Sequence, residues 1–519
     1  MPVFLQLRLW LSQGPARERV AAGVAVAIAI TLLILASLPM TDSGGGHGST
    51  IASAGGEANG ADVLGGATSA NGATANGAGG TAGALGASGV NSGTASSTGA
   101  GSTGATSGSA SARTAAAGPS CTGTLAASAP GITPTQVSVD VSYVDLAGPV
   151  GNAAFSIRPD QQQIIAAAAD NINKTGGVAC GRKIVVKSYA VNPIDQNDQQ
   201  SKCLQMVQDK PFAVLDAAGY ITPVSRACFW QNKLPLQIST SAGNTELGKG
   251  APYLYGIIAP SEKQLRDAAL GLAAQGFFAA PKFKKLGLLE DSCDPAANGE
   301  LESSLAKAGV GSGQISKVVI SCQLVAPPNE IQQAVITNRT AGATHVLLAS
   351  SISNSQNYTT LAAQQNFHPV YATSDYGTDT ANTGHWDASF VGALAITSNH
   401  YGELSSGIRN AQVNACDALL KAHGLTGINS EKNDETALQI CDQFNFFRQA
   451  LDTVGGNPTR QSFIDAGLDR MGLFHGSIMG DGNFDRPDKL VGGDFHRTIQ
   501  FDGGCSCWKV KDPNFTPGF

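Results

Sequence analysis

Apolar residues along this chain recur in two patterns that alternate from residue 135 onward. Short runs of alternating or continuous apolar positions are typical of strands, and longer stretches with apolar residues on one helical face are typical of helices. VSVDVSYV, residues 137–144, predicts a strand, and DQQQIIAAAADNIN, residues 160–173, predicts a helix. Gly176 and Gly177 follow this stretch, and glycine in a left-handed conformation commonly ends helices. The patterned region therefore opens with a strand and a helix.

The same alternation continues to the end of the chain. Further strands are predicted at 183–191, 211–219 and 234–240, with helices at 196–209 and 222–233. A second series starts with a helix at 261–276 and has strands at 284–291, 316–321, 344–351, 369–375 and 390–398. Three helical stretches follow, including 434–454, and then short strands, among them 494–504. Strands separated by such helices form parallel, doubly wound sheets, so we expect two α/β lobes with a cleft between them.

The first 120 residues have a different composition and cannot build a hydrophobic core. Residues 20–40 are apolar apart from one threonine and one serine, and they are long enough to cross a bilayer. Three arginines precede this segment, so the positive-inside rule places residues 1–19 in the cytoplasm. We therefore predict an uncleaved transmembrane signal-anchor at 20–40. A cleaved signal peptide is the alternative, because LAS precedes Leu38.

Residues 41–120 consist almost entirely of Gly, Ala, Ser, Thr and Asn, in strings such as GATSANGATANGAGG. Sequence with so little apolar bulk cannot offset chain entropy, so we predict a disordered linker, with a glycosylated stalk as an alternative. Residues 121–519 form the globular part. With the anchor retained, that part would lie outside the cytoplasm, attached to the cell membrane by a single pass.

Charge and cysteine usage narrow the possible functions. The net charge is −6, and no basic cluster supports a nucleic-acid surface. All ten cysteines lie between Cys121 and Cys507, which suits disulfides formed in an oxidising compartment. A metal site is not predicted, because the only close pair, Cys505-Ser506-Cys507, has no second pair of ligands to complete it.

Three segments occur in the order and spacing of a known family. VDLAGPVGNAAF (144–155), NINKTGGVACGRKIVV (171–186) and NKLPLQISTSAGNTEL (232–247) resemble the first lobe of the type I periplasmic solute-binding proteins. These are the leucine-, amide- and urea-binding group that supplies ABC importers. The resemblance covers about residues 134–503. It implies two Rossmann-like lobes joined by three crossovers, which close on a ligand held between them.

On this pattern, one lobe combines about 134–257 and 399–472, and the other combines about 260–396 and 475–519. One departure concerns anchoring: members anchored by lipid carry a cysteine after a Leu-Ala-Ser-like box, and this chain has Leu38 there. The long linker is also unusual for a simple importer component, which leaves delivery to a permease open.

The resemblance implies ligand-binding residues at the carboxyl ends of the strands, where doubly wound sheets receive ligands. In the first lobe these residues are Asn152, Phe155, Tyr220, Thr222, Ser239 and Ser241, and in the second they are Ser351, Asp375 and Tyr376. Asp375 stands where family members that bind amino acids place an acid for the ammonium group. Structural alternatives are a core role for Phe155, an ordinary N-cap for Thr222 and a turn or cap for Asp375. Glu290 and Asp291 are alternative acids.

Other chemistry is disfavoured. The turn at 148–155 lacks both GxGxxG and a P-loop lysine, so no nucleotide cofactor is predicted. The histidines form no HExxH metal-binding motif, and HGSIMG does not match the GxSxG nucleophile elbow. The sequence therefore does not predict an enzyme. DGNFDRPD, residues 481–488, imitates a calcium loop but has Arg486 where glycine is needed.

The predicted order of helices and strands also indicates which cysteines form disulfides. Right-handed crossovers place the second and third helices of the first lobe side by side, which brings Cys203 to Cys228. Neighbouring strands and consecutive helices bring together two further pairs, Cys293 with Cys322 and Cys416 with Cys441. The pairing of Cys121, Cys180, Cys505 and Cys507 stays open.

These observations predict a membrane-tethered, extracytoplasmic solute-binding protein. It would clamp an amino acid or amide-like solute between its lobes for ABC-type import, with an ABC permease as partner and no cofactor. The alternatives are a ligand sensor that signals to a membrane partner and a cell-envelope structural protein that binds no solute.

Overall fold

The computed structural model describes residues 121, 123–146, 148, 157–218, 220–378, 380–381, 386–486 and 489–519. The predicted anchor at 20–40 and the linker at 41–120 lie outside these residues, as do Asn152 and Phe155. Within the described part of the chain, no helix is both long and apolar enough to cross a membrane.

The first sheet has five parallel strands in the order β2-β1-β3-β4-β5. Their bounds are β1 Gln136–Val144, β2 Lys183–Val191, β3 Ala213–Ala218, β4 Leu236–Ile238 and β5 Leu254–Gly256. The prediction of a parallel sheet from alternating strands and helices is confirmed here. The order places β1 and β3, whose carboxyl ends carry predicted ligand residues, next to each other.

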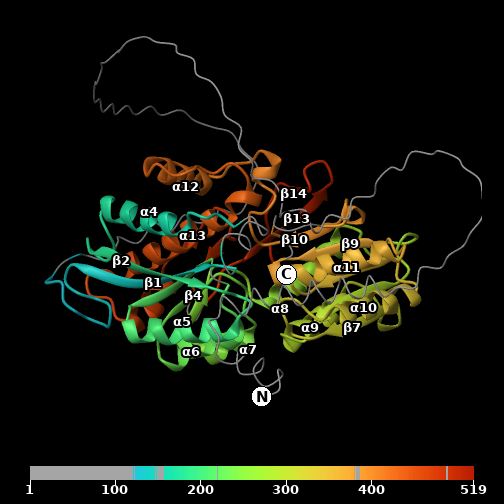
Figure 1. Ribbon diagram of the computed structural model, residues 1–519, viewed down its shortest axis with the longest axis horizontal. Coiled ribbons are helices and arrows are strands. Elements are labelled where there is room, and N and C mark those ends of the chain that lie inside the picture. The colour runs from blue at the N-terminus through green and yellow to red at the C-terminus, as the bar shows by residue number, and fades with distance from the viewer. Residues whose placement is uncertain are drawn as a thin grey trace, which may run out of the picture. The chain divides into compact units, whose positions relative to one another are not determined.

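Helices cover both faces of this sheet (Figure 1). One face carries α4 Gln161–Lys174, α12 Ala411–Ala422 and α13 Glu431–Val454, and the other carries α5 Gln196–Asp209 and α6 Pro223–Gln231, with α7 Asn244–Gly250 after β4. Buried apolar residues pack on both faces, and the cluster on the α4 and α13 side continues into residues of the second sheet. Helix α4 ends before Gly176 and Gly177, whose φ angles are 110° and 73°, as the sequence predicted.

The second sheet has the order β14-β13-β10-β9-β8-β6-β7, with β15 paired to β13. Its parallel strands are β6 Leu286–Asp291, β7 Ile315–Ile320, β8 His345–Ala349, β9 Val370–Ser374 and β10 Leu394–Thr397. The antiparallel strands are β13 Phe495–Asp502, β14 Cys507–Val510 and β15 Thr516–Pro517. Its helices are α8 Ser261–Ala274, α9 Pro295–Lys307, α10 Pro328–Thr340 and α11 Ile352–Gln364. Shorter elements include β11 Leu473–Phe474, β12 Gly482–Asn483 and α14 Arg460–Ser462.

Two elements differ in length from their predictions for local reasons. Helix α13 begins at Glu431, three residues before the predicted start, because the Ser430 side chain accepts a hydrogen bond from the Asn433 amide and caps the helix. Strand β10 begins only at Leu394, because Gly392 has a φ of 88° and breaks the extended conformation. Both differences arise at turns, where hydrophobic periodicity carries little information.

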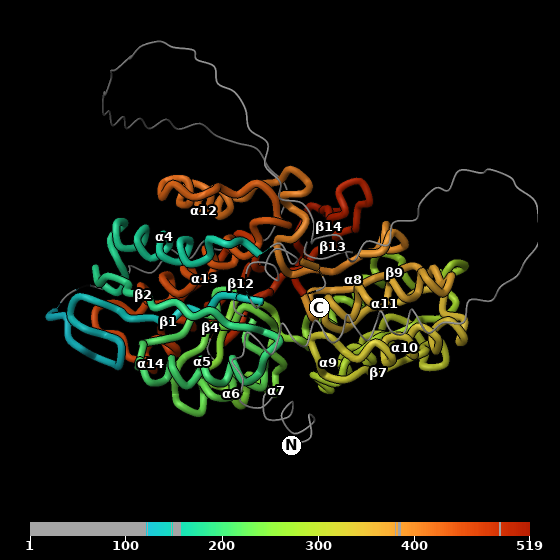
Figure 2. The backbone as a smooth tube through the Cα atoms, in the orientation of Figure 1, coloured from blue at the N-terminus to red at the C-terminus, as the bar shows by residue number. Residues whose placement is uncertain are grey.

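The chain passes between the two sheets more than once. Helices α12 and α13 follow β10 of the second sheet in sequence, yet α13 packs against β3 and α4 of the first (Figure 2). Strands β13 and β14 then return to the second sheet. This course brings buried polar residues of α13 beneath the carboxyl ends of the first-sheet strands.

All ten cysteines form disulfides. The three predicted pairs, Cys203–Cys228, Cys293–Cys322 and Cys416–Cys441, are confirmed. The pairing that the sequence left open is Cys121–Cys180 and Cys505–Cys507.

Candidate functional site

The predicted residues of the first sheet follow β3 and β4, and we call the carboxyl end of these strands the first-sheet edge. Tyr220 follows β3 with a φ of 52°, and its hydroxyl donates to Gln439 Oε1 at 3.2 Å. Thr222 stands at the N-cap position of α6 but does not cap it. Its amide and hydroxyl both donate to Gln199 Oε1 at 2.9 Å. Both predicted residues therefore take part in hydrogen bonds with helices that cover the sheet.

Asp216, the fourth residue of β3, organises the first-sheet edge. Its Oδ2 accepts hydrogen bonds from the Ser239 hydroxyl at 2.9 Å and the Ile221 amide at 3.1 Å, and its Oδ1 accepts from the Ser142 hydroxyl at 2.7 Å. The side chain is fully buried, and this burial raises the pKa of its carboxyl group. The sequence analysis did not select Asp216, although an acid inside the apolar run PFAVLDAAG was a signal.

Arg226 on α6 supplies a positive charge at the same edge. It is 1% exposed, and it donates to the carbonyl oxygens of Ile221 at 2.9 Å and Ser241 at 3.1 Å. An ion pair with Glu246 at 3.1 Å balances its charge. Ser241, a predicted ligand residue, is thus held through its backbone by a buried guanidinium.

The predicted residues of the second sheet lie where β8 and β9 end, and we call this the second-sheet edge. The Ser351 side chain caps α11 and donates to the Leu324 carbonyl at 2.6 Å. The Tyr376 hydroxyl donates to Asp291 Oδ1 at 3.0 Å, so Asp291 and Tyr376 meet here. The alternative acid Glu290 is buried in β6, 4.0 Å from Lys317, and burial raises its pKa to about 7.

Asp375 directly follows β9 and is 6% exposed. Its Oδ1 accepts from the Thr380 hydroxyl at 2.5 Å, and its Oδ2 accepts from the Ser398 amide at 2.6 Å and hydroxyl at 2.8 Å. Burial raises the pKa of this carboxyl group, and these hydrogen bonds oppose the rise. Asp375 therefore joins the end of β9 to the end of β10.

A buried tyrosine brings the two edges into one electrostatic environment. The Tyr401 hydroxyl, four residues after β10, donates to Glu435 Oε1 of α13 at 2.9 Å, and Gln439 Nε2 donates to the same oxygen at 3.0 Å. Burial, Glu435, Tyr220 and Asp375 all raise the pKa of Tyr401. Because Gln439 also accepts a hydrogen bond from the Tyr220 hydroxyl, a continuous chain of hydrogen bonds links the first-sheet edge to Tyr401.

Glu435 was not predicted, and its carboxylate is only partly used. It is 3% exposed, and burial raises its pKa to about 7. Its Oε2 has no hydrogen-bond partner among the described residues. A buried carboxylate oxygen of this kind is a good acceptor for an ammonium, amide or hydroxyl group.

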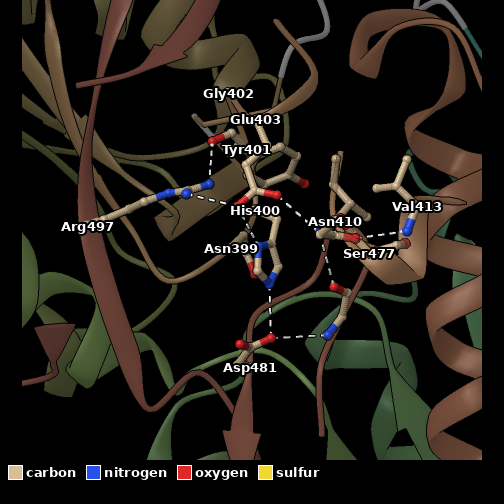
Figure 3. Close-up of polar contacts among 12 residues, drawn as sticks. Asn399, His400, Tyr401, Gly402, Glu403, Asn410, Val413, Ser477, Asp481 and Arg497 are labelled. Carbon is tan, nitrogen blue, oxygen red and sulfur yellow. Dashed lines mark hydrogen bonds and ion pairs between the residues drawn. The ribbon is translucent and has the colours of Figure 1, made fainter. Parts of the chain in front are cut away.

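Beside this tyrosine, two chain segments that run between the sheets are joined by His400 (Figure 3). Its Nδ1 lies 2.9 Å from Glu403 Oε1 and its Nε2 lies 2.9 Å from Asp481 Oδ1. Arg497 of β13 pairs with the same Glu403 oxygen at 2.9 Å. Burial alone lowers the pKa of His400, but the hydrogen bonds with Asp481 and Glu403 raise it to about 9. The histidine is therefore protonated at neutral pH and bridges both segments.

Other observations bear on metal and ligand sites. No group of three or more His, Cys, Asp or Glu side chains in the described ranges is placed to hold a metal ion. A separate hollow of about 820 Å³ is lined by parts of α7 and α8 and by residues near 461–469 and 486–494. None of the predicted ligand residues lines it.

Comparison with known proteins adds evidence about the fold. No protein-family model and no curated protein matches the sequence. A fatty acid ABC transporter substrate-binding protein from Thermomonospora curvata matches the structure with a TM-score of 0.55 and 14% identity, over 76% of this chain and 95% of that one. An ABC transporter solute-binding protein from R. palustris, in complex with 4-hydroxybenzoate, matches with a TM-score of 0.56 and 12% identity, over 74% and 97%.

A third match is the branched-chain amino acid transporter substrate-binding protein from Streptococcus pneumoniae, in complex with isoleucine. Its TM-score is 0.51 and its identity 16%, over 74% of this chain and 100% of that one. The fold that the sequence resemblance implied is thus confirmed, and the chain has the fold of the type I periplasmic solute-binding proteins.

Proposed function

We propose that this chain binds a small polar solute between its two lobes and serves as the solute-binding component of an ABC-type importer. The observation that carries the proposal is a chain of hydrogen bonds between the two sheets. It runs from Tyr220 at the first-sheet edge through Gln439 and Glu435 of α13 to Tyr401, which follows β10 of the second sheet. In doubly wound folds, ligands bind beyond the carboxyl ends of the strands, where these residues lie.

The charges at the two edges support an amino acid or a related amine as the solute. The second-sheet edge carries Asp291 and Asp375, and Glu435 adds a carboxylate oxygen without a partner. A solute ammonium group near Asp375 would find negative charge there. At the first-sheet edge, Glu246 already pairs with Arg226, so a solute carboxylate there would depend on the hydroxyl groups of Thr222 and Ser239.

A solute carboxylate at the first-sheet edge has to compete with existing hydrogen bonds. Thr222 donates to Gln199, and Ser239 donates to Asp216. Occupancy by a solute would redirect these hydroxyls, whereas an amine without a carboxylate would leave them in place. The chemical form of the solute can therefore be tested separately from the fact of binding.

Thermal unfolding of the purified full chain tests the proposal. The panel is isoleucine, its amide, the matching amine without the carboxylate, and 4-hydroxybenzoate. Binding to the native state stabilises it by RT ln(1 + [L]/Kd), about 2.7 kcal/mol at a hundredfold excess over Kd. We expect at least one amine-bearing compound to raise Tm. If neither this panel nor a wider set of amino acids, amides and polyols raises Tm, solute binding is refuted and a structural role is favoured.

We also propose that residues 20–40 tether the globular part outside the membrane, as their apolar character and the preceding arginines indicate. Full-length protein should then sediment with membranes, and peptides from residues 1–19 should be recovered by mass spectrometry. A mature N-terminus near Leu38 or Thr41 would exclude the tether.

A further inference from the structure

We propose that the Cys505–Cys507 disulfide is a thiol–disulfide exchange site, oxidised and reduced reversibly by external thiols while the fold stays intact. Its two cysteines are separated by one residue, whereas the other four disulfides have sequence separations of 25 to 59. Neither cysteine is among the proposed ligand residues or their hydrogen-bond partners, so the proposal does not rest on the function proposed above.

The covalent geometry makes this disulfide a weak stabiliser. A disulfide acts largely by restricting the unfolded chain, and this effect grows with the length of the loop it closes. A loop with one residue between the cysteines restricts the unfolded chain least. That intervening residue, Ser506, has a φ of 48°, a conformation that costs energy for any residue other than glycine.

The hairpin that carries the disulfide is held together by other interactions. Strands β13 and β14 pair from Ile499 with Val510 to Asp502 with Cys507. The Asp502 Oδ1 accepts hydrogen bonds from the amides of Gly504 at 2.9 Å and Cys505 at 3.1 Å. We therefore expect the turn to keep its shape when the sulfur–sulfur bond is broken.

The aromatic core beneath the hairpin anchors β14 as well. Trp508, the residue after Cys507, is fully buried and packs edge-to-face against Phe390 and Phe501. Reduction of the disulfide removes none of these contacts.

Exposure indicates which sulfur an external thiol attacks. Residues 503–506 are exposed, Cys505 among them, and Cys507 is 7% exposed. An incoming thiolate would attack Sγ of Cys505 and form a mixed disulfide, and the sulfur–sulfur bond would break with its electron pair leaving on Cys507. Exposed or strained disulfides are the more easily reduced ones, which fits this assignment.

A second external thiol completes the reduction. It attacks the mixed disulfide at the external sulfur and releases Cys505 as a thiol. Two external thiols are thereby oxidised to one disulfide, the Cys505–Cys507 bond is reduced, and two protons pass to the cysteines. The substrates are small thiols such as glutathione, or accessible dithiols.

Cys293–Cys322 is the matched control for reactivity. Both of its cysteines are exposed, so exposure alone would make it equally reducible, but its sequence separation is 29. The full chain is equilibrated in glutathione redox buffers, free thiols are alkylated, and each cysteine peptide is quantified. We expect Cys505–Cys507 to be half reduced at a [GSH]²/[GSSG] ratio at least tenfold lower than Cys293–Cys322, about 30 mV. An equal or higher ratio would overturn the proposal.

Single substitutions test the direction of attack. In Cys507→Ser the remaining Cys505 should form a mixed disulfide with oxidised glutathione at least tenfold faster than Cys507 does in Cys505→Ser. Equal rates would contradict attack at Cys505.

The double variant Cys505→Ser with Cys507→Ser tests whether the disulfide is structurally dispensable. It should unfold within a few degrees of the parent, and reoxidation of the reduced parent should restore Cys505–Cys507 with the other four disulfides unchanged. A double variant that fails to fold would show that the disulfide is structural and would refute the proposal.

Discussion

The two strand edges of this molecule use buried aspartates differently. At the first-sheet edge, Asp216 accepts hydrogen bonds from neighbouring strands, and Arg226 lies close by with positive charge. At the second-sheet edge, Asp375 and Asp291 accept hydrogen bonds from hydroxyl groups, and neither forms an ion pair with a residue in the described part of the chain. One edge is therefore electrically balanced and the other is acidic. A solute with two charged ends, as proposed above, would therefore bind in one orientation, with its cationic end toward the second sheet.

The largest effect should come from removing the cation of the balanced edge. Arg226→Met leaves Glu246 and the nearby Asp216 without their buried positive partner, and breaking a buried ion pair commonly costs about 3–5 kcal/mol. Urea unfolding should show this loss. Arg266→Met is the control, because its ion pair with Glu300 at 3.7 Å is part exposed and should contribute under about 1 kcal/mol. Equal losses in the two variants would contradict the difference between the edges.

Removing the acid of the acidic edge should affect solute binding. If the proposed function holds, Asp375→Ala takes away the charged partner of the solute ammonium, and binding should weaken by about 2–5 kcal/mol in a desolvated site. Calorimetric titration with the solute identified by thermal shift measures it. Asp387→Ala, which removes the cap of a short helical turn, is the control. Affinity of Asp375→Ala within threefold of the parent would favour a neutral solute such as an amide or polyol.

The ion pairs of His400 with Glu403 and Asp481 should contribute less to stability at alkaline pH. The pKa of His400 is raised from 6.5 to about 9 in the folded state, so its contribution is complete below pH 6.5. That contribution falls as pH rises to about 9, by roughly 3 kcal/mol at 1.36 kcal/mol per pH unit. Unfolding free energies from pH 6 to pH 10 for the parent and His400→Gln measure it. Parallel pH profiles for the two proteins would contradict the bridge between Glu403 and Asp481.

The smallest effect concerns single hydroxyls on Asp216. Ser142→Ala and Ser239→Ala each remove one hydrogen bond to its carboxylate, for an expected loss of about 1–3 kcal/mol. We expect the two losses to be non-additive, because both hydroxyls bond the same buried group. A double-mutant cycle by urea unfolding measures the coupling, and strict additivity would argue against a shared network.

Much of the fold was predictable because hydrophobic periodicity is local. The predicted ranges 183–191 and 196–209 coincide with β2 and α5, and three disulfides followed from the order of the elements. The candidate site was less predictable. Tyr220, Thr222, Ser239, Ser351, Asp375 and Tyr376 lie at strand ends, but the roles of Asp216, Arg226 and Glu435 were missed. Asn152 and Phe155 lie outside the described residues and stay predictions.

The missed contacts are far apart in sequence. Tyr220 and Gln439 are separated by 219 residues, and His400 and Asp481 by 81. Helix α13 reaches the first sheet only because the chain returns to it after β10. Local hydrophobic periodicity therefore cannot predict that α13 packs against the first sheet.

The positions of strands and helices follow from the sequence, because the repeat of apolar side chains decides which face of each element leaves water. The even number of cysteines and the polar residues at strand ends are also visible in the sequence. Which polar groups share a buried space depends on the tertiary fold. Burial there raises the pKa values of Asp216, Asp375 and Glu435 and makes each hydrogen bond to them count, because water is no longer present to replace a missing partner.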